Sequence, residues 1–522
     1  MLLFRASLLA ITVLSGAVLA ATCESIAALK LPDTTFTSAL AVPAGDFPIP
    51  EGRTTVQLPA FCRVQGVIRP TSDSSIAFEV WMPSSGWNGR YLGVGNGGLA
   101  GSVNYSAAAG NAPGMAQALA AGYATSSTDT GHHAAATNSD WALGHPEKVI
   151  DYGYRAIHLT AVNTKQIIRS YYGKDSTPYF SSCSNGGRQA LMEAQRYPTD
   201  YTGIVAGDPA WYATHLAAAQ VWNVQATESD PAGYIPANKL PAIAAAVMAK
   251  CDVLDGVKDG VIDDPRKCHF DPAALLCKNG DSDTCLTAPQ VQALAKIYAG
   301  PSNSNGAQIF PGIFPGGESG PGGWGTWITG AQPGKSLIYS FGVGGLAKIV
   351  YQDPAWDFRR FNFDHDVAYL DDKLGPVRNA TDANLKAFQD AGGKLILYHG
   401  WSDPDIAPLS TPDYYEKVSA KLGRQDTDQF MRVYMVPGML HCGGGSGATV
   451  LGSVPGSGAD PKRGIQAVLE NWVEKGAAPA EIIATKAGTT ATRPVCAYPK
   501  AARYKGEGRP DEAASYACIE DR

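Results

Sequence analysis

The sequence has no CxxC pair and no HExxH motif, which are common zinc-binding patterns. It has no internal repeat, and after its first residues it has no apolar run of the ~20 residues needed to span a membrane. Charged residues make up only 17% of the chain, and the formal net charge is -6. Because nucleic acids and anionic membrane surfaces attract basic proteins, this balance argues against both as partners.

The chain is long enough to contain more than one hydrophobic core. Its 522 residues predict about two or three domains, or one domain with a large insertion. Hydrophobic residues account for 45% of the chain, which is typical of a globular protein and not of a disordered one.

The first 21 residues resemble a secretory signal. Arg5 supplies a positive charge, residues 8–19 form an apolar run, and small residues follow at Ala20 and Ala21. A membrane anchor is the alternative, but the run is too short to span a bilayer. A lipoprotein signal is disfavoured because Thr22, and not a smaller residue, precedes Cys23. We therefore expect a signal peptide at 1–21 and a secreted or periplasmic protein that leaves the membrane once the signal is removed.

Ten cysteines, an even number, favour disulfide bonds in an exported chain. The sequence alone does not fix their connectivity, but simple nesting of neighbours favours one arrangement. Its five pairs are Cys23–Cys62, Cys251–Cys268, Cys277–Cys285, Cys496–Cys518 and, as the remainder, Cys183–Cys442.

The pair Cys183–Cys442 bears on chemistry because Cys183 immediately precedes Ser184 and Cys442 immediately follows His441. A disulfide requires its two Cα atoms to lie within about 7 Å of each other. This bond would therefore bring a serine and a histidine within reach of each other, and a serine hydroxyl needs such a base to become a nucleophile.

Strand-like and helix-like segments alternate toward both ends of the chain. Short apolar runs next to glycine turns predict strands, and apolar residues that recur near helical spacing predict helices. This alternation is typical of an α/β fold with a mostly parallel sheet and covering helices. The predicted strands are Ala77–Met82, Arg90–Val94, Pro178–Phe180, Lys394–Tyr398 and Arg432–Val436, and the predicted helices are Tyr154–Tyr172, Arg188–Arg196 and a last helix that Asp460 caps, Pro461 begins and Gly476 ends.

The middle of the chain follows a different pattern. Residues 211–391 are helical at first and then rich in loops, and residues 301–334 are dense in glycine, proline and serine. Long loops in a compact protein are often lids or binding loops, and a plain surface loop is the alternative. We expect a core in two parts, 22–210 and 392–522, with a lid domain at 211–391 inserted between them.

Ser184 lies in the segment Ser182-Cys183-Ser184-Asn185-Gly186-Gly187. This is close to the GxSxG elbow, a sharp turn between a strand and a helix that exposes the serine oxygen. Ser182 replaces the first glycine. Small residues are needed here because the turn packs the backbones of strand and helix tightly, although an ordinary small-residue turn is the alternative.

Asp403 and His441 complete a candidate catalytic set, because each follows a predicted strand and the chain order is Ser, Asp, His. His441 would take the proton of Ser184, and Asp403 would orient the imidazole and stabilise its charged form. Asp405, two positions later, is a rival for the acid. The oxyanion would need preorganised N–H donors, for which Asn185 and Gly98 are the candidates.

A second motif lies in the expected lid, between Cys251 and Asp264. Calcium binds carboxylate and backbone oxygens in glycine-containing turns. The spacing differs from that of an EF-hand loop, and an acidic turn without metal is the alternative. The candidate ligands of this structural calcium ion are the carboxylates of Asp252, Asp255 and Asp259 and the carbonyls of Val257 and Val261.

Together these motifs resemble the tannase and feruloyl esterase family, in which a Cys-Ser nucleophile and a His-Cys base are joined through their cysteines. Cys183-Ser184, Asp403 and His441-Cys442 match that arrangement. The glycine loop, the acidic loop and the nested cysteines match as well. The resemblance implies an α/β-hydrolase core with a lid inserted between the serine and the aspartate, and no organic cofactor.

The resemblance also implies hydrolysis of esters of aromatic acids, free or on a plant polymer. Galloyl, feruloyl and terephthalate esters all stay open as substrates. There are two alternatives. One is another α/β-hydrolase of the lipase or peptidase type, and the other is a calcium-stabilised binding protein without activity. The candidates for contact with the substrate are Trp324, Trp327, Phe341, Arg359 or Arg360, and His399.

Overall fold

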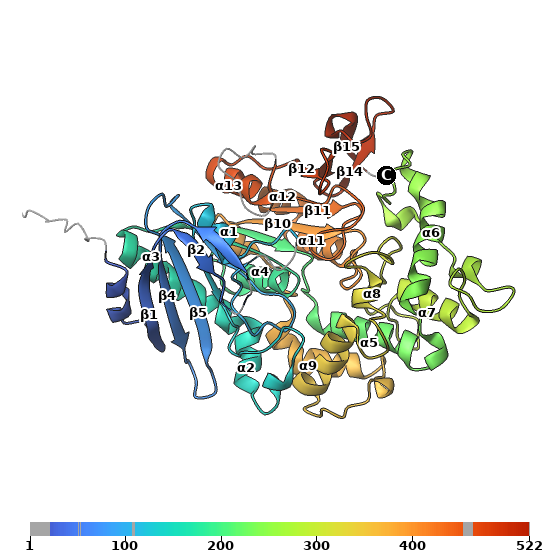
Figure 1. Ribbon diagram of the computed structural model, residues 1–522, viewed down its shortest axis with the longest axis horizontal. Coiled ribbons are helices and arrows are strands. Elements are labelled where there is room, and N and C mark those ends of the chain that lie inside the picture. The colour runs from blue at the N-terminus through green and yellow to red at the C-terminus, as the bar shows by residue number, and fades with distance from the viewer. Residues whose placement is uncertain (1–20, 51, 53, 107–109, 453–462, 521–522) are drawn as a thin grey trace, which may run out of the picture.

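The computed structural model describes residues 21–520 except 51, 53, 107–109 and 453–462 (Figure 1). Apart from Ala21, the predicted signal peptide lies outside the described residues. Nine strands form one sheet in the order β1-β4-β5-β7-β6-β8-β9-β10-β11. They are β1 Thr34–Val42, β4 Phe61–Ile68, β5 Ile76–Pro83, β6 Arg90–Val94, β7 Ala124–Thr128, β8 Thr177–Cys183, β9 Gly203–Gly207, β10 Lys394–Gly400 and β11 Met431–Val436.

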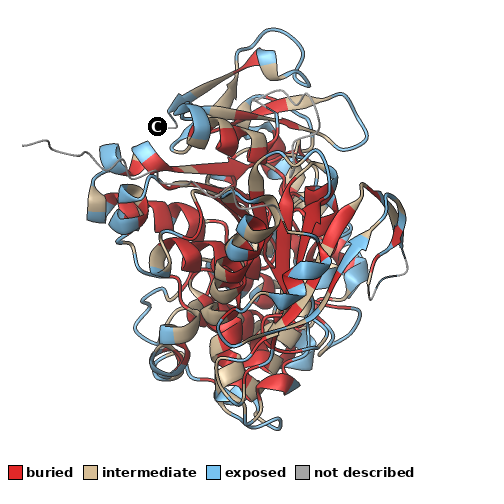
Figure 2. Cartoon of the chain, turned by 90° about the vertical axis from the view of Figure 1, so that its left-hand side faces the viewer, coloured by how far each residue is buried: buried red, intermediate tan, exposed pale blue. Residues whose placement is uncertain are grey.

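Six of these strands, from β7 to β11 in sheet order, run parallel, and β1, β4 and β5 add an antiparallel edge. Successive side chains of a strand point to opposite faces of the sheet. A strand that is covered on both faces therefore has a continuous run of apolar residues in its sequence. In β8, Tyr179 packs into the core on one face and Phe180 into the core on the other. The central strands are therefore buried over most of their length (Figure 2).

Helices cover both faces of the sheet. On one face α3 (Ala156–Tyr172), α4 (Asn185–Arg196) and α11 (Ser410–Leu422) share a hydrophobic core with the strands. On the other face, α1 (Met115–Ala120) and α13 (Ile465–Lys475) do the same. This arrangement is the α/β fold with a mostly parallel sheet that the alternation of segments predicted.

The predicted elements correspond closely to those of the structure. Strand β6 has the predicted bounds, and the other predicted strands lie within β5, β8, β10 and β11. A π-helical turn, Asp151–Arg155, precedes α3, and α4 begins at Asn185 instead of Arg188 because the helix starts directly after the serine turn. The predicted helix start at Asp460 and Pro461 lies outside the described residues, whereas Gly476 ends α13 with φ 71° as expected.

The segment predicted as a lid connects β9 to β10, which are adjacent and parallel in the sheet. Most of its helices share a hydrophobic core of their own and lie to one side of the sheet (Figure 1), whereas Phe388, near the end of the segment, packs into a core of the sheet. Local sequence fixes several of them: α7, for example, begins at a capping box of Thr287 and Gln290 with a proline in its first turn. The helices are α5 Ala213–Glu228, α6 Leu240–Cys251, α7 Ala288–Ala299, α8 Trp324–Trp327, α9 Asp366–Arg378 and α10 Lys386–Asp390.

Small hairpins and short helices complete the described chain. None of its helices is long and apolar enough to cross a bilayer. The C-terminal hairpins pack beside the acidic loop that follows α6. The remaining elements are the hairpins β2 Gly45–Pro48 with β3 Thr55–Leu58, β12 Glu481–Thr485 with β13 Thr492–Cys496, and β14 Lys500–Tyr504 with β15 Tyr516–Glu520, and the helices α2 Pro146–Ile150 and α12 Arg424–Phe430.

Candidate active site

Ser184 lies at the turn between β8 and α4, with φ 66° and ψ -127°. A positive φ is unusual for a residue with a side chain, and such strain is often found at functional positions. A Cβ atom on Gly186 would clash with Ser182, and one on Gly187 would clash with the carbonyl of Gly207. The turn therefore requires the small residues on which the prediction of a serine elbow was based.

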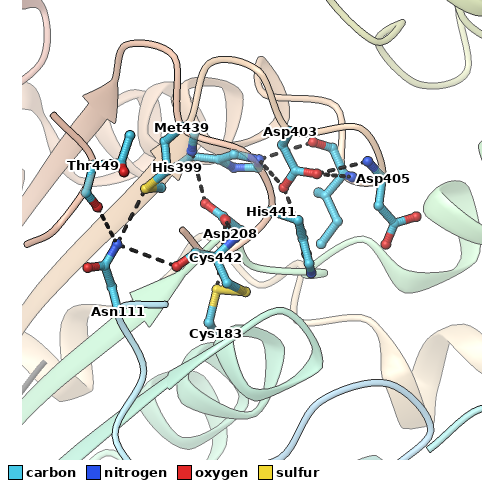
Figure 3. The surroundings of a disulfide bond; sticks show 12 residues. Asn111, Cys183, Asp208, His399, Asp403, Asp405, Met439, His441, Cys442 and Thr449 are labelled. Carbon is cyan, nitrogen blue, oxygen red and sulfur yellow. Dashed lines mark hydrogen bonds and ion pairs between the residues drawn. A yellow bond between two sulfur atoms is a disulfide. The ribbon is translucent and has the colours of Figure 1, made fainter. Parts of the chain in front are cut away.

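The disulfide Cys183–Cys442 joins this turn to the loop that carries His441, with the two Cα atoms 5.9 Å apart (Figure 3). The other four bonds also join the cysteines that nesting paired: Cys23–Cys62, Cys251–Cys268, Cys277–Cys285 and Cys496–Cys518.

His441 and Asp403 are hydrogen-bonded. The Nδ1 atom of His441 lies 2.7 Å from Oδ2 of Asp403, and both side chains are buried. Burial disfavours the imidazolium, but the charge and the hydrogen bond of Asp403 raise the pKa of His441 to about 9. Burial likewise disfavours the carboxylate, yet His441 and His399 hold the pKa of Asp403 below its ordinary value. The pair is thus arranged to stabilise a protonated imidazole.

The other ring nitrogen of His441, Nε2, is buried and has no hydrogen-bond partner among the described residues. Trp327 of the insertion packs edge to face with the imidazole, with ring centroids 4.5 Å apart. Ser184 lines the cavity beside this site. The nitrogen that a general base would use is therefore unengaged, whereas the other one is held.

Asp405, the rival acid, occupies a different position. Its Oδ1 accepts a hydrogen bond from Nε2 of Gln220 at 2.7 Å, and it lines the same cavity as Ser184. Burial raises the pKa of Asp405 to about 6. Within the described part of the chain it makes no hydrogen bond to His441, so the imidazole is oriented by Asp403.

Two residues behind Asp403 and His441 support them. We expected His399 to contact the substrate, but it does not line the cavity. It is fully buried, with Nε2 3.3 Å from Oδ2 of Asp403. Asp208, which the sequence reading missed, accepts hydrogen bonds from the N–H groups of Gly400 and Cys442 (Figure 3). It directly follows β9, so the strand-end signal that singled out Asp403 could also have found it.

The two candidate oxyanion donors also lie at the site. Gly98 has φ 54°, and a Cβ atom there would meet the carbonyl of Ala136 at 2.7 Å, so the position requires glycine. Asn185 is the first residue of α4. Both residues line the cavity with Ser184, and among the described residues neither N–H group is used in a hydrogen bond.

The cavity is mostly apolar, and the insertion supplies part of its wall. Phe341 lines it, as expected, whereas Trp324 is buried in the core of the insertion. Arg359 and Arg360 are exposed and lie away from the cavity, so the arginine at the site is a different one, Arg378. The lining residues are Gly98, Leu99, Ser184, Asn185, Ala210, Ala213, Leu216, Ala217, Gln220, Phe341, Arg378, Asp405 and Ile406.

The acidic loop after α6 is organised by its own backbone. Oδ1 of Asp252 accepts from the N–H groups of Asp259 and Gly260, while Asp255 and Asp259 accept from the N–H groups of the buried residues Val257 and Val261, respectively.

The free carboxylate oxygens of this loop face an arginine. Arg493 lies 3.4 Å from Asp255, 2.9 Å from Asp259 and 2.7 Å from Asp263. One oxygen of Asp263 is buried without a partner. The excess of carboxylates over cations suits a divalent ion, although the oxygens of Asp252, Asp255 and Asp259 are not gathered within 4.8 Å of one another.

Comparison with known proteins places this geometry in a family. The family described as tannase and feruloyl esterase matches residues 62–519. An uncharacterised esterase of Xanthomonas campestris is 42% identical, with 97% of this chain and 92% of that protein aligned. The crystal structure of feruloyl esterase B from Aspergillus oryzae superimposes with a TM-score of 0.85 and 29% identity, over 95% of this chain and 99% of the other.

A tannin acyl hydrolase from Aspergillus niger shares the fold, with a TM-score of 0.74, 20% identity and coverage of 96% and 95% of the two chains. The likeness extends over core and insertion alike, because nearly the whole chain is aligned in each case. The protein is a carboxylic ester hydrolase with an α/β-hydrolase fold, and it belongs to the tannase and feruloyl esterase family.

Proposed function

We propose that the protein is a serine esterase in which Ser184 is the nucleophile, His441 the general base and Asp403 the residue that orients the base. The observation that carries this proposal is the 2.7 Å hydrogen bond between His441 and Asp403. The residue after His441, Cys442, is disulfide-bonded to Cys183, the neighbour of Ser184. The free Nε2 atom of His441 supports the same assignment.

The reaction would proceed through an acyl-enzyme. His441 takes the proton of Ser184 as its oxygen attacks the acyl carbon, and then donates that proton to the leaving alcohol. A water molecule repeats the attack on the acyl-enzyme, so that the acid is released and the serine restored. The N–H groups of Gly98 and Asn185 would stabilise the oxyanion in both steps.

An aromatic acyl group suits the walls of the cavity. Phe341 lines it, and Trp327 stands against His441, so an aromatic ring would pack on aromatic and aliphatic side chains. Esters of hydroxycinnamic or gallic acid, either free or attached to a plant polymer, are the substrates we propose. The name of the Aspergillus oryzae relative, feruloyl esterase B, supports the first of these.

Export from the cytoplasm is part of the proposal. The signal-like first 21 residues and five disulfide bonds support it, because disulfides persist in oxidising compartments.

A structural calcium ion in the loop 252–261 is a further part of the proposal. The unpartnered oxygen of Asp263 and the three carboxylates around a single guanidinium support it. Chelation should lower the melting temperature and leave the rate per folded molecule at low temperature unchanged. An unchanged melting temperature would argue against the ion.

A substrate panel with the variant Ser184→Ala tests the chemistry. Wild-type protein should hydrolyse methyl ferulate or methyl gallate faster than nitrophenyl esters of long-chain fatty acids. It should also hydrolyse them faster than the anilides of ferulic or gallic acid. Ser184→Ala should lose this activity by at least about a thousandfold. Undiminished hydrolysis by the variant would overturn the serine mechanism, and a preference for long-chain esters or amides would move the protein to a lipase or peptidase class.

A further inference from the structure

The hydroxyl of Tyr152 contacts both residues of the proposed oxyanion hole. It lies 2.8 Å from the carbonyl oxygen of Gly98 and 3.0 Å from Oδ1 of Asn185. Gly98 belongs to the loop after β6, whereas Asn185 begins α4. One side chain therefore links two segments that are far apart in the sequence and carry the two N–H donors.

The link matters because nothing intrinsic fixes the conformation of Gly98. Glycine explores more backbone conformations than other residues, and Gly98 has a positive φ of 54°. The next residue is anchored, since the N–H of Leu99 donates to the carbonyl of Ala136 and its carbonyl lies 3.0 Å from Nε2 of His132. The glycine loop and the serine turn are joined directly by Nδ2 of Asn185, which donates to the carbonyl of Asn96 at 3.2 Å. Tyr152 adds a second connection, and this one reaches Gly98 itself.

The side chain of Tyr152 is itself fixed by several contacts. It lies in the π-helical turn Asp151–Arg155, a kind of turn that is frequent at functional sites. Its ring contacts Trp141 and His132 edge to face. The guanidinium of Arg188 lies 5.3 Å from the centre of the ring, and that of Arg378 lies 5.0 Å from it.

Both arginines also act on the polar contacts of Tyr152. Nε of Arg188 donates to Oδ1 of Asn185 at 2.9 Å, and Nη2 of Arg378 donates to the hydroxyl of Tyr152 at 3.2 Å. Neither arginine has an ion-pair partner among the described residues. A tyrosine hydroxyl that accepts from a cation is polarised and becomes a stronger donor of its single proton, which either of the two acceptors can receive. Arg378 ends α9 of the insertion, so this contact joins the insertion to the oxyanion hole.

We propose that Tyr152 is a positioning residue that holds the N–H groups of Gly98 and Asn185 in register for the oxyanion, and that Arg378 acts through it. The inference rests on the proposed serine mechanism. Oxyanion stabilisation depends on donors that are placed before the charge develops, and losing one donor typically costs about 10²- to 10³-fold in kcat. A variant that keeps both N–H donors but positions them less firmly should lose less kcat than one that lacks a donor.

The variant Tyr152→Phe tests the inference, because it keeps the ring and removes only the hydroxyl. We expect kcat to fall by about ten- to a hundredfold with KM changed less than about twofold. Inhibition by a trifluoromethyl ketone analogue, which forms an oxyanion adduct with the serine, should weaken by the same factor as kcat/KM. Tyr434→Phe is the matched control, since among the described residues its buried hydroxyl bonds only the carbonyl of Pro479, away from the proposed site.

A purely structural role predicts a different result. In that case the melting temperature would fall in both variants, while kcat and the ketone affinity per folded molecule would match those of the control; this outcome would overturn the inference. Ser184→Ala keeps the two proposals separate. If it is inactive while Tyr152→Phe has the wild-type kcat, the serine mechanism stands and the role of Tyr152 falls.

A double-mutant cycle tests the role of Arg378. Arg378→Met should lower kcat in the wild-type background and have no further effect in the Tyr152→Phe background. Additive losses in the two backgrounds would contradict action through Tyr152. A raised KM for esters that carry a second carboxylate, with kcat unchanged, would likewise contradict it and assign Arg378 to the substrate.

Discussion

Two clusters of carboxylates in this protein differ in the cations they face. In the cluster at the proposed active site, Asp208, Asp403 and Asp405 surround His399 and His441. In the lid cluster, defined by Asp255, Asp259 and Asp263, a single arginine, Arg493, is the partner of all three. Both clusters place several acids around few cations, and a sequence reader would call both simply acidic.

The difference lies in whether the cation can release its proton. Burial opposes the charge of the His441 imidazolium, but Asp403 raises the pKa of His441 to about 9. The imidazole can therefore still take up a proton and release it. The guanidinium of Arg493 stays charged at any accessible pH, and its acidic neighbours raise its pKa further in spite of burial. The first cluster can therefore carry out proton transfer, whereas the second can only hold segments together.

The largest effect should come from removing the charge that orients His441. Asp403→Asn keeps the shape of the side chain but favours the wrong imidazole tautomer, and we expect kcat to fall by about 10⁴-fold. Asp405→Asn, two residues along the chain, should cost far less. Steady-state kinetics on both variants measure the contrast. A larger loss in Asp405→Asn would transfer the role of the acid to Asp405.

Each cluster is flanked by a disulfide, and the two bonds should not be equivalent. Cys183–Cys442 closes 259 residues, whereas Cys251–Cys268 closes 17. Replacing both cysteines of a pair by alanine should cost about 5 kcal/mol of unfolding free energy for the first and about 3 kcal/mol for the second.

Only the loss of Cys183–Cys442 should also reduce kcat, because that bond fixes His441 relative to Ser184. Denaturant unfolding and kinetics at low temperature distinguish the two effects. Full activity without Cys183–Cys442 would show that noncovalent contacts, such as those of Asp208, already position the loop.

The contacts that sequence reading found differ in kind from those it missed. Ser184, Asp403 and His441 follow strands directly, and the small residues of the serine turn are constrained locally, so their positions carry a signal. The paired cysteines added a long-range constraint.

Tyr152, Arg378 and Arg493 carry no such signal. Their roles come from contacts between segments that only the folded chain brings together, namely the π-helical turn, the end of α9 and strand β13. The same reasoning explains why Arg359 and Arg360 were wrong candidates, since composition shows that an arginine is present but not which one faces the cavity.

Removal of the cation from the lid cluster should affect stability and not catalysis. Arg493→Gln leaves three carboxylates without their partner. Two of them, those of Asp255 and Asp263, are buried, and breaking a buried ion pair typically costs about 3 to 5 kcal/mol. We expect a lower melting temperature that added calcium partly restores, with kcat at low temperature unchanged. Lys500→Gln, on the exposed end of β14, is the surface control. A wild-type melting temperature in Arg493→Gln, with or without calcium, would mean that the cluster holds nothing together.

The smallest effect should be a shift in pH dependence. Only the unprotonated imidazole of His441 can accept the proton of Ser184, so kcat/KM should rise with pH through the pKa of His441, near 9. The negative charge of Asp405 is one of the causes that raise this pKa. Asp405→Asn removes that charge, which disfavours the imidazolium, so the rising limb of the profile should move to lower pH by less than about one unit.

The corresponding change in the lid cluster, Asp263→Asn, should leave the profile where it is, because that cluster takes no part in the proposed proton transfer. A pH profile of kcat/KM for the wild type and both variants provides the measurement. A shift in Asp263→Asn equal to that in Asp405→Asn would mean that the two clusters are electrostatically coupled, and the division between a cluster that moves protons and one that holds segments would fail.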